Sequence, residues 1–214
     1  MAAARKLYGV VGATPTLRAL ASLFEHDLEF EFVAIEHLQD HLFSLSPFGQ
    51  LPIYQDGDMT LFGSRAIMRG ISHTYLHPQQ DQIYMKPKLQ GLASTWIDVE
   101  DHHFDPLASW LVSELVFKPR RGEPVDETAV AEAEAKLASV LDVYEERLGA
   151  SEYLGGDKFT SADLTHLPHL YYLMRTPVKR LFDERRRVGE WCARIMDRPA
   201  WAKVVEMVEA AHQK

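Results

Sequence analysis

The first third of the chain alternates short apolar runs with turn residues, and the remainder has a longer, helical period. Runs that predict strands occupy residues 6–11, 28–35, 53–55 and 59–62. The last two flank Asp56-Gly57-Asp58, which predicts a β-hairpin. Helical spacing in this third covers residues 14–25 and 65–75, and residues 38–46 predict a short irregular or helical piece. This order predicts a small mixed α/β domain over residues 1–77.

Beyond residue 86 the apolar positions recur only at helical spacing. Helices are predicted over residues 87–116, 126–148, 161–173, 183–197 and 199–212. Pro78 and the polar run that follows it predict a linker over residues 78–86. We therefore expect an all-helical second domain over residues 87–214.

Three helix starts have hydroxyl residues in suitable positions. Thr14, followed by Pro15, and Ser64 each predict an N-cap, since their side-chain oxygens can accept a bond from a free backbone amide. Thr160 and Asp163 have the spacing of a capping box, which assigns them a role in folding rather than chemistry.

Composition and charge narrow the possible functions. The chain has 214 residues and a formal net charge of −8, so a nucleic acid is not expected as a partner. The single cysteine, Cys192, excludes an internal disulfide and is expected to be a buried, inert thiol. No run reaches 18 apolar residues and the N-terminus does not predict a signal peptide, so we expect a cytoplasmic protein without membrane association.

Several sequence blocks occur together in one order. They include Phe48-Gly49-Gln50-Leu51-Pro52, Ser64-Arg65-Ala66-Ile67, His103-Phe104-Asp105-Pro106 and Glu114-Leu115-Val116-Phe117-Lys118-Pro119. With these blocks the chain resembles the glutathione transferase family, and its plant phi class most closely. The resemblance implies a thioredoxin-like α/β domain followed by an all-α domain, and a homodimer. It also implies glutathione as cosubstrate, with no prosthetic group or metal.

The chemistry that the resemblance implies is attack by the glutathione thiolate on a small apolar electrophile, or reduction of an organic hydroperoxide. The resemblance assigns glutathione binding to the backbone of Leu51, to a cis Pro52, and to Gln50 and Ser64 at the γ-glutamyl end. Arg65 is expected to pair with a carboxylate of either glutathione or the protein. Phe48 is expected either in the core or as a dimer anchor.

The chain departs from the family pattern at two positions of the glutathione-binding site, which is called the cradle below. Ala13 occupies the place of the catalytic serine, and alanine cannot donate a hydrogen bond to sulfur. Thr14 is the candidate replacement, either as a sulfur ligand or as a helix cap only, and Thr16 is a weaker candidate. Gly63 replaces the glutamate that would hold the γ-glutamyl ammonium.

The segment between residues 35 and 48 is also about five residues shorter than the resemblance implies. It lacks the His-Lys pair that would hold the glycyl carboxylate, and His37 or His41 could serve instead. Because the residues that would hold the γ-glutamyl ammonium and the glycyl carboxylate are altered, we expect weak glutathione binding.

The acceptor site is expected between the two domains, where clefts collect apolar walls. Its predicted residues are Val11, Gly12, His102, Leu107, Trp110, Leu111 and Phe117. Trp110 is the main candidate for a wall against planar ligands. The spacing of Leu107, Trp110 and Leu111 is equally that of a helix face packed in the core.

Three functions remain open from the sequence. The first is a glutathione transferase with weakened thiol activation. The second is a carrier of flavonoid-type planar ligands on the same fold, with little or no catalysis. The third is a scaffold that retains only the fold.

Overall fold

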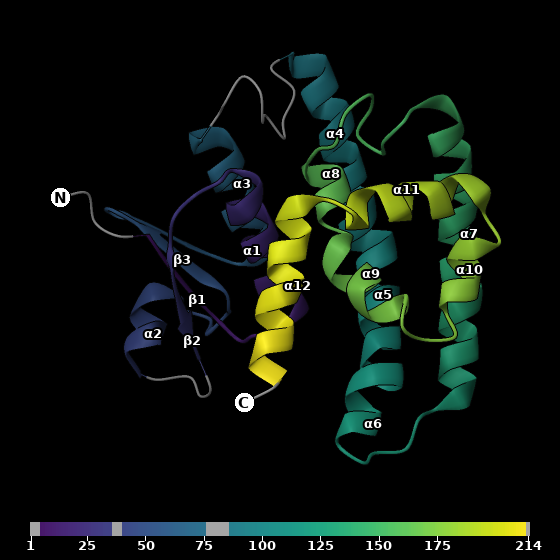
Figure 1. Cartoon of the computed structure of the whole chain (residues 1–214), viewed down its shortest axis with the longest axis horizontal. Coiled ribbons are helices and arrows are strands. Elements are labelled where there is room, and N and C mark those ends of the chain that lie inside the picture. Colours follow the sequence, from purple (N-terminus) through teal and green to yellow (C-terminus); the bar gives the residue numbers. More distant parts are fainter. Residues whose placement is uncertain (1–4, 36–39, 76–85, 213–214) are drawn as a thin grey trace. The chain divides into compact units, whose positions relative to one another are not determined.

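The computed structural model describes residues 5–35, 40–75 and 86–212, and their contacts divide the chain into two compact units (Figure 1). The first unit contains residues 1–82 and 198–214, and the second contains residues 83–197. None of the helices in the described part of the chain is long and apolar enough to cross a membrane.

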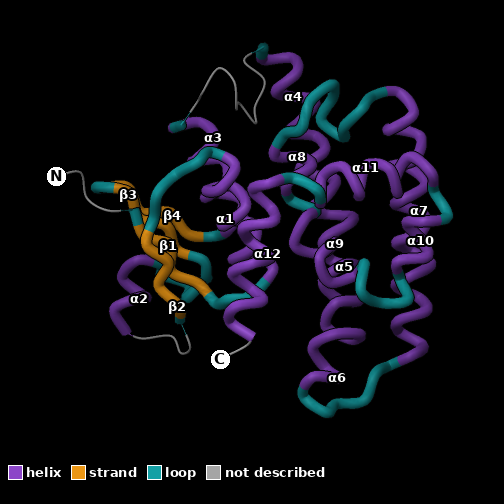
Figure 2. Tube along the Cα trace, viewed as in Figure 1, coloured by secondary structure: helices purple, strands orange, loops and turns teal. Residues whose placement is uncertain are grey.

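The first unit is a four-stranded sheet with helices on both sides. Its elements are β1 (Lys6–Gly9), α1 (Thr14–Glu25), β2 (Glu31–Ala34), α2 (Asp40–Leu45), β3 (Ile53–Asp56), β4 (Met59–Phe62), α3 (Ser64–Thr74) and α12 (Pro199–His212). The strand order is β2-β1-β3-β4, with β1 parallel to β2 and antiparallel to β3. Figures 1 and 2 show α2 on one side of the sheet and α1 and α3 on the other. The predicted mixed α/β architecture and its hairpin are confirmed.

The register of the central strands brings three loops to one edge of the sheet. Ile53 of β3 pairs with Tyr8 of β1 and with Phe62 of β4. Pro52, one residue earlier, therefore lies beside the end of β1 and the end of β4. The loop after β1, the loop before β3 and the start of α3 consequently meet at this edge.

The last helix belongs to the first unit by its contacts. Helix α12 packs on α1, and Arg198 forms an ion pair with the nearly buried Glu25. The sequence places residues 199–212 in the helical domain, because periodicity identifies a helix without showing what it packs against. The predicted linker over residues 78–86 lies outside the described residues except for residue 86.

All the named elements in the described part of the second unit are helices. Its elements are α4 (Pro87–Val99), η1 (Glu100–Phe104), α5 (Asp105–Val112), η2 (Ser113–Phe117), α6 (Lys118–Arg120), α7 (Glu127–Ala150), α8 (Ser161–Leu164), α9 (Leu167–Leu173), α10 (Lys179–Asp183) and α11 (Arg186–Met196). The segments from α4 to α6 follow one another directly, with π-helical turns at η1 and η2. This run extends four residues beyond the helix predicted over residues 87–116.

Two predicted helices of this unit differ from those in the structure. Residues 161–173 form α8 and α9, separated by a turn at Thr165 and His166. The helix predicted over residues 183–197 begins only at Arg186, because Arg185 has an extended backbone. Cys192 on this helix is buried, as predicted, and burial raises the pKa of its thiol.

Two predicted N-caps are displaced by one residue. The N-cap of α1 is Ala13, with Thr14 as the first helical residue, and the N-cap of α3 is Gly63, with Ser64 as the first. Neither cap residue makes a side-chain capping bond. The assignments of Thr14 and Ser64 as caps are therefore wrong, and neither hydroxyl is used to close its helix start.

The predicted capping box at α8 is confirmed. The Thr160 side chain accepts a hydrogen bond from the Ala162 amide, and the Asp163 carboxylate accepts one from the Thr160 amide at 3.0 Å. Asp163 also accepts bonds from the Leu154 amide and from Nε1 of Trp191, at 2.9 and 3.0 Å. This one buried carboxylate thus connects the start of α8 to a preceding loop and to α11.

Substitution of Asp163 tests this connection through the pH dependence of stability. Burial raises the pKa of Asp163 from 3.8 to about 6, while its hydrogen bonds oppose the shift. The folded state therefore holds the proton more tightly, and stability from this group is lost as pH rises through about 6. We expect the free energy of unfolding of the wild type, minus that of Asp163→Asn, to fall by about 2–3 kcal/mol between pH 4 and 7. Urea unfolding at several pH values measures it, and a difference that grows with pH would contradict the assignment.

Candidate functional site

The loop before β3 presents an open backbone edge. The Leu51–Pro52 peptide bond is cis, as the resemblance implies. The Gln50 amide donates to Oγ of Ser46 at 2.9 Å, and the Pro52 carbonyl accepts from the Gly63 amide at 3.2 Å. Among the described residues, the backbone of the half-buried Leu51 between them has no hydrogen-bond partner. Its amide and carbonyl can therefore pair with an extended peptide ligand.

The start of α3 adds polar groups at the same edge. Gly63 has a φ of 81°, in the left-handed region, and a Cβ built on it would lie 3.9 Å from Oε1 of Gln50. Ser64 follows with its side chain nearly buried, and its Oγ accepts a hydrogen bond from Nη1 of Arg18 at 2.9 Å. The first amides of a helix have no partner within it and carry its positive dipole end, so this start suits an anionic group.

The start of α1 shows which hydroxyl is available near the loop after β1. Thr16 is fully buried, and its Oγ1 accepts a hydrogen bond from the Val10 amide at 3.2 Å. Gly9 packs so closely on Thr16 that an added Cβ would lie 2.7 Å from it. Thr16 therefore has a structural role. The half-buried Thr14 has no side-chain hydrogen bond within the described part of the chain.

The remaining predicted glutathione contacts are placed only in part. Arg65 is half-buried on the first turn of α3 and has polar or ring interactions of its own. His37 lies outside the described residues, and so does the side chain of His41.

The residues predicted for the acceptor site belong to both units. Val11 and the buried Gly12 lie in the turn between β1 and α1 of the first unit. In the second unit, His102 is exposed on η1, Leu107 and Phe117 are half-buried, and Leu111 is fully buried. Trp110 on α5 is 48% exposed, so it is not a core residue, unlike Leu111 beside it.

One group in the described chain has metal-ligand chemistry. Glu100, Asp105 and His169 have ligand atoms within 4.8 Å of one another. Nε2 of His169 lies 2.9 Å from Oγ of Ser109 and 3.7 Å from a carboxylate oxygen of Asp105. We interpret this group as an internal pairing of an imidazole with carboxylates, because its contacts already connect α5 to α9.

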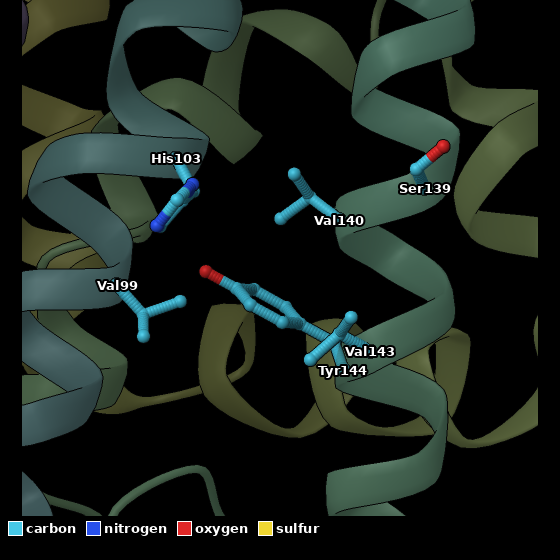
Figure 3. A pocket seen from close by; sticks show the side chains of 6 residues that line it. All are labelled: Val99, His103, Ser139, Val140, Val143 and Tyr144. Carbon is cyan, nitrogen blue, oxygen red and sulfur yellow. The ribbon is translucent and has the colours of Figure 1, made fainter.

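A separate apolar hollow of about 290 Å³ opens on the second unit (Figure 3). It lies between α4, η1 and α7 and is lined by Val99, His103, Ser139, Val140, Val143 and Tyr144. Val143 is 54% exposed. In the first unit, Phe48 at the sheet edge is 80% exposed, so it is not a core residue of this chain.

Two family models match this chain. Residues 3–73 match the family model for the glutathione S-transferase N-terminal domain, and residues 104–199 match that for the C-terminal domain. The chain belongs to the glutathione S-transferase family. A glutathione S-transferase from Hyoscyamus muticus is 48% identical over 206 residues, covering 94% of this chain and 97% of the relative.

Solved structures show the same relation for this glutathione S-transferase. Glutathione transferase F2 from Populus trichocarpa superimposes with a TM-score of 0.93 at 37% identity, covering 96% of this chain and 99% of the other. Glutathione S-transferase I from mais, in complex with an atrazine glutathione conjugate, has a TM-score of 0.90 at 31% identity, covering 97% and 99%. The close homologues are plant phi-class enzymes.

Arg18 is the residue that the sequence reasoning missed in this transferase. It is only 2% exposed, although charged residues are rarely buried without partners. The available signal was its position between Leu17 and Ala19, in the mostly apolar stretch over residues 17–24.

Substitution of Gly63 tests the backbone of the cradle. Since its φ of 81° is unfavourable for residues with a Cβ, Gly63→Ala should lower the free energy of unfolding by about 1–3 kcal/mol. Gly91 is the matched control, because it lies in α4 with open space around an added Cβ. Gly91→Ala should raise stability by about 0.5–1 kcal/mol. Urea unfolding measures both, and equal effects would show that the Gly63 conformation is not strained.

Proposed function

We propose that this enzyme conjugates glutathione to small apolar electrophiles, or reduces organic hydroperoxides with it, and that its activation of the glutathione thiol is weakened. The main support for this proposal is the edge of the sheet where the unpaired Leu51 backbone, the α3 start and the α1 start meet. Homology over almost the whole chain supports the same chemistry. The mais relative bound to an atrazine glutathione conjugate shows the product class of one such reaction.

In this proposal the cradle holds glutathione mainly through its peptide backbone. The amide and carbonyl of Leu51 pair with the cysteinyl part, as an added strand would. Gln50, Ser64 and the α3 start hold the γ-glutamyl end, where a carboxylate meets the helix dipole. Gly63 provides no carboxylate for the ammonium group, so binding is weak.

Thiol activation is the step that the chain weakens. A thiolate attacks far faster than a thiol, so a transferase lowers the thiol pKa by charge and hydrogen bonding. Ala13 cannot donate to sulfur, and Thr16 uses its hydroxyl on the Val10 amide. Thr14 remains as the hydroxyl at the mouth of α1, because Ala13 and not Thr14 is the N-cap. We therefore assign the remaining hydrogen bond to sulfur to Thr14.

The electrophile is proposed to bind against the residues predicted for the acceptor site. Val11 and Gly12 on the β1–α1 turn directly precede Ala13 and Thr14, the residues proposed to lie near the glutathione thiol. The exposed indole of Trp110 provides a flat wall in the second unit, and His102, Leu107, Leu111 and Phe117 belong to the same helical run.

A carrier of planar ligands is the second candidate function. The exposed Trp110 favours it, together with the loss of side chains at Ala13 and Gly63. Calorimetry with glutathione and with a flavonoid separates the two. If the protein is a transferase, we expect measurable glutathione binding and a conjugation rate that rises with pH. Absent glutathione binding with tight flavonoid binding would contradict it and support the carrier.

The active form is proposed to be a cytoplasmic homodimer. Phe48 lies between Pro47 and Gly49 and is 80% exposed, and aromatic side chains are enriched as anchors in protein–protein interfaces. The hollow beside Val140 and Val143 is apolar and open (Figure 3). In a two-fold dimer each copy would place its Phe48 in the hollow of the other, a self-complementary contact.

Substitution of Thr14 tests the proposed thiol activation. Thr14→Ala should raise the pKa of the bound glutathione thiol by about one unit, because a hydrogen bond to the thiolate is lost. Conjugation at neutral pH should fall by about tenfold in consequence. Thiolate absorbance against pH, with conjugation rates measured in parallel, gives both values.

Two matched variants interpret that result. Thr14→Ser keeps the hydroxyl and should keep the thiol pKa. Ala13→Ser restores a donor and should lower the thiol pKa and raise the turnover. An unchanged pKa in Thr14→Ala would remove Thr14 from the mechanism, and no gain from Ala13→Ser would show that the α1 start does not face the sulfur.

Substitution of Phe48 tests the homodimer. Phe48→Ala should weaken dimerisation at least tenfold, because truncation of a buried aromatic anchor commonly costs more than 2 kcal/mol. Val143→Lys should do the same from the other side of the contact. Leu92→Ala removes another exposed apolar side chain, one that does not line the hollow, and should have no effect. Sedimentation equilibrium measures the constants, and a monomeric wild type would contradict the dimer.

A further inference from the structure

We propose that Arg18 is a positioning residue for the anionic end of the ligand and acts through the hydroxyl of Ser64. This inference rests on the proposed binding of glutathione and names a residue of that site without an assigned role. Arg18 does not need to touch the ligand, because its hydrogen bond to Ser64 connects the interior of α1 to the start of α3.

Arg18 lies one helical turn beyond Thr14, on the second turn of α1. Long side chains on a helix point back toward its N-terminus, so the guanidinium extends toward the edge where the loops meet. The residue is 2% exposed. Burial of a guanidinium is costly unless polar groups compensate it, so a simple packing role would favour an apolar residue here.

The hydrogen bond determines the direction in which the Ser64 hydroxyl points. A guanidinium can only donate, so Oγ of Ser64 accepts the 2.9 Å bond from Nη1. The hydroxyl hydrogen must then point away from Arg18. Because Ser64 is the first residue of α3, this hydrogen and the free amides of the first turn can face the same acceptor.

Charge reinforces this orientation. The α3 start carries roughly half a positive charge, and the Arg18 guanidinium adds positive charge behind the hydroxyl. Both side chains are almost completely buried, so water screens this field less than at the surface. The arrangement favours a carboxylate of the ligand, which in glutathione is the γ-glutamyl carboxylate.

A double-mutant cycle on glutathione binding tests the coupling. Calorimetry would compare the wild type, Arg18→Lys, Ser64→Ala and the double variant. Lysine keeps the charge but loses the planar fork of donors. We expect each single change to weaken glutathione binding about 5–10-fold and the double variant to be within about twofold of Ser64→Ala. At saturating glutathione, kcat of Arg18→Lys should stay near the wild-type value while KM rises.

A second ligand separates positioning from a purely structural effect. An analogue without the γ-glutamyl α-carboxylate should bind the wild type and Arg18→Lys equally. Arg69→Lys changes an exposed arginine on α3 and should leave both affinities unchanged.

Three results would overturn the inference. They are multiplicative losses in the double variant, a loss that persists with the decarboxylated analogue, and a normal glutathione affinity of Arg18→Lys. If Arg18→Lys does not fold, equal losses of glutathione and of the analogue in Ser64→Ala would overturn it instead. A wild type that binds no glutathione would refute the proposed function itself, and this inference with it.

Discussion

The pairing of β3 with both β1 and β4 is the constraint on which the candidate site depends. Ile53 is opposite Tyr8 on one side and Phe62 on the other. This double register places the cis Pro52, the turn after β1 and the start of α3 at one edge of the sheet. A slip of one residue would turn the buried side chains of β3 to the opposite face. The core side chains of Ile53 and Tyr54 therefore hold the cradle in place as much as its polar residues do.

Within that edge, positions of helix starts decide which groups remain available for a ligand. Because α1 begins at Thr14 and α3 at Ser64, neither hydroxyl is used as a helix cap. One is oriented by Arg18 and the other has no side-chain hydrogen bond within the described residues. The cradle thus retains the groups that position a peptide and an anion. The groups that activate a thiol are reduced to one hydroxyl and a helix dipole.

Much of the fold could be predicted because its signals are local. Apolar periodicity located the strands and most helices, including residues 199–212 with their correct ends. The capping box at Thr160 and Asp163 was readable from spacing alone. The grouping of α12 with the first unit was not, since packing partners depend on contacts distant in sequence.

The site was predictable mainly through the family resemblance, whereas its details depend on tertiary structure. Cap preferences favour Thr14 and Ser64 over Ala13 and Gly63, so they place both helix starts one residue late. Burial of Arg18 could not be expected from its type. The exposure of Phe48 and Trp110 likewise depends on tertiary structure, because the same spacing suits a core residue.

Proton release during glutathione binding tests weakened thiol activation most directly. Calorimetry of the wild type at pH 7, in buffers with different ionisation enthalpies, gives the number of protons released. A free thiol with a pKa of about 8.5 is almost fully protonated at this pH. We expect release of less than about 0.2 proton per glutathione bound, because a weakly activated thiol stays protonated. Release of more than about 0.6 proton would show a strongly activated thiol and would contradict weakened activation.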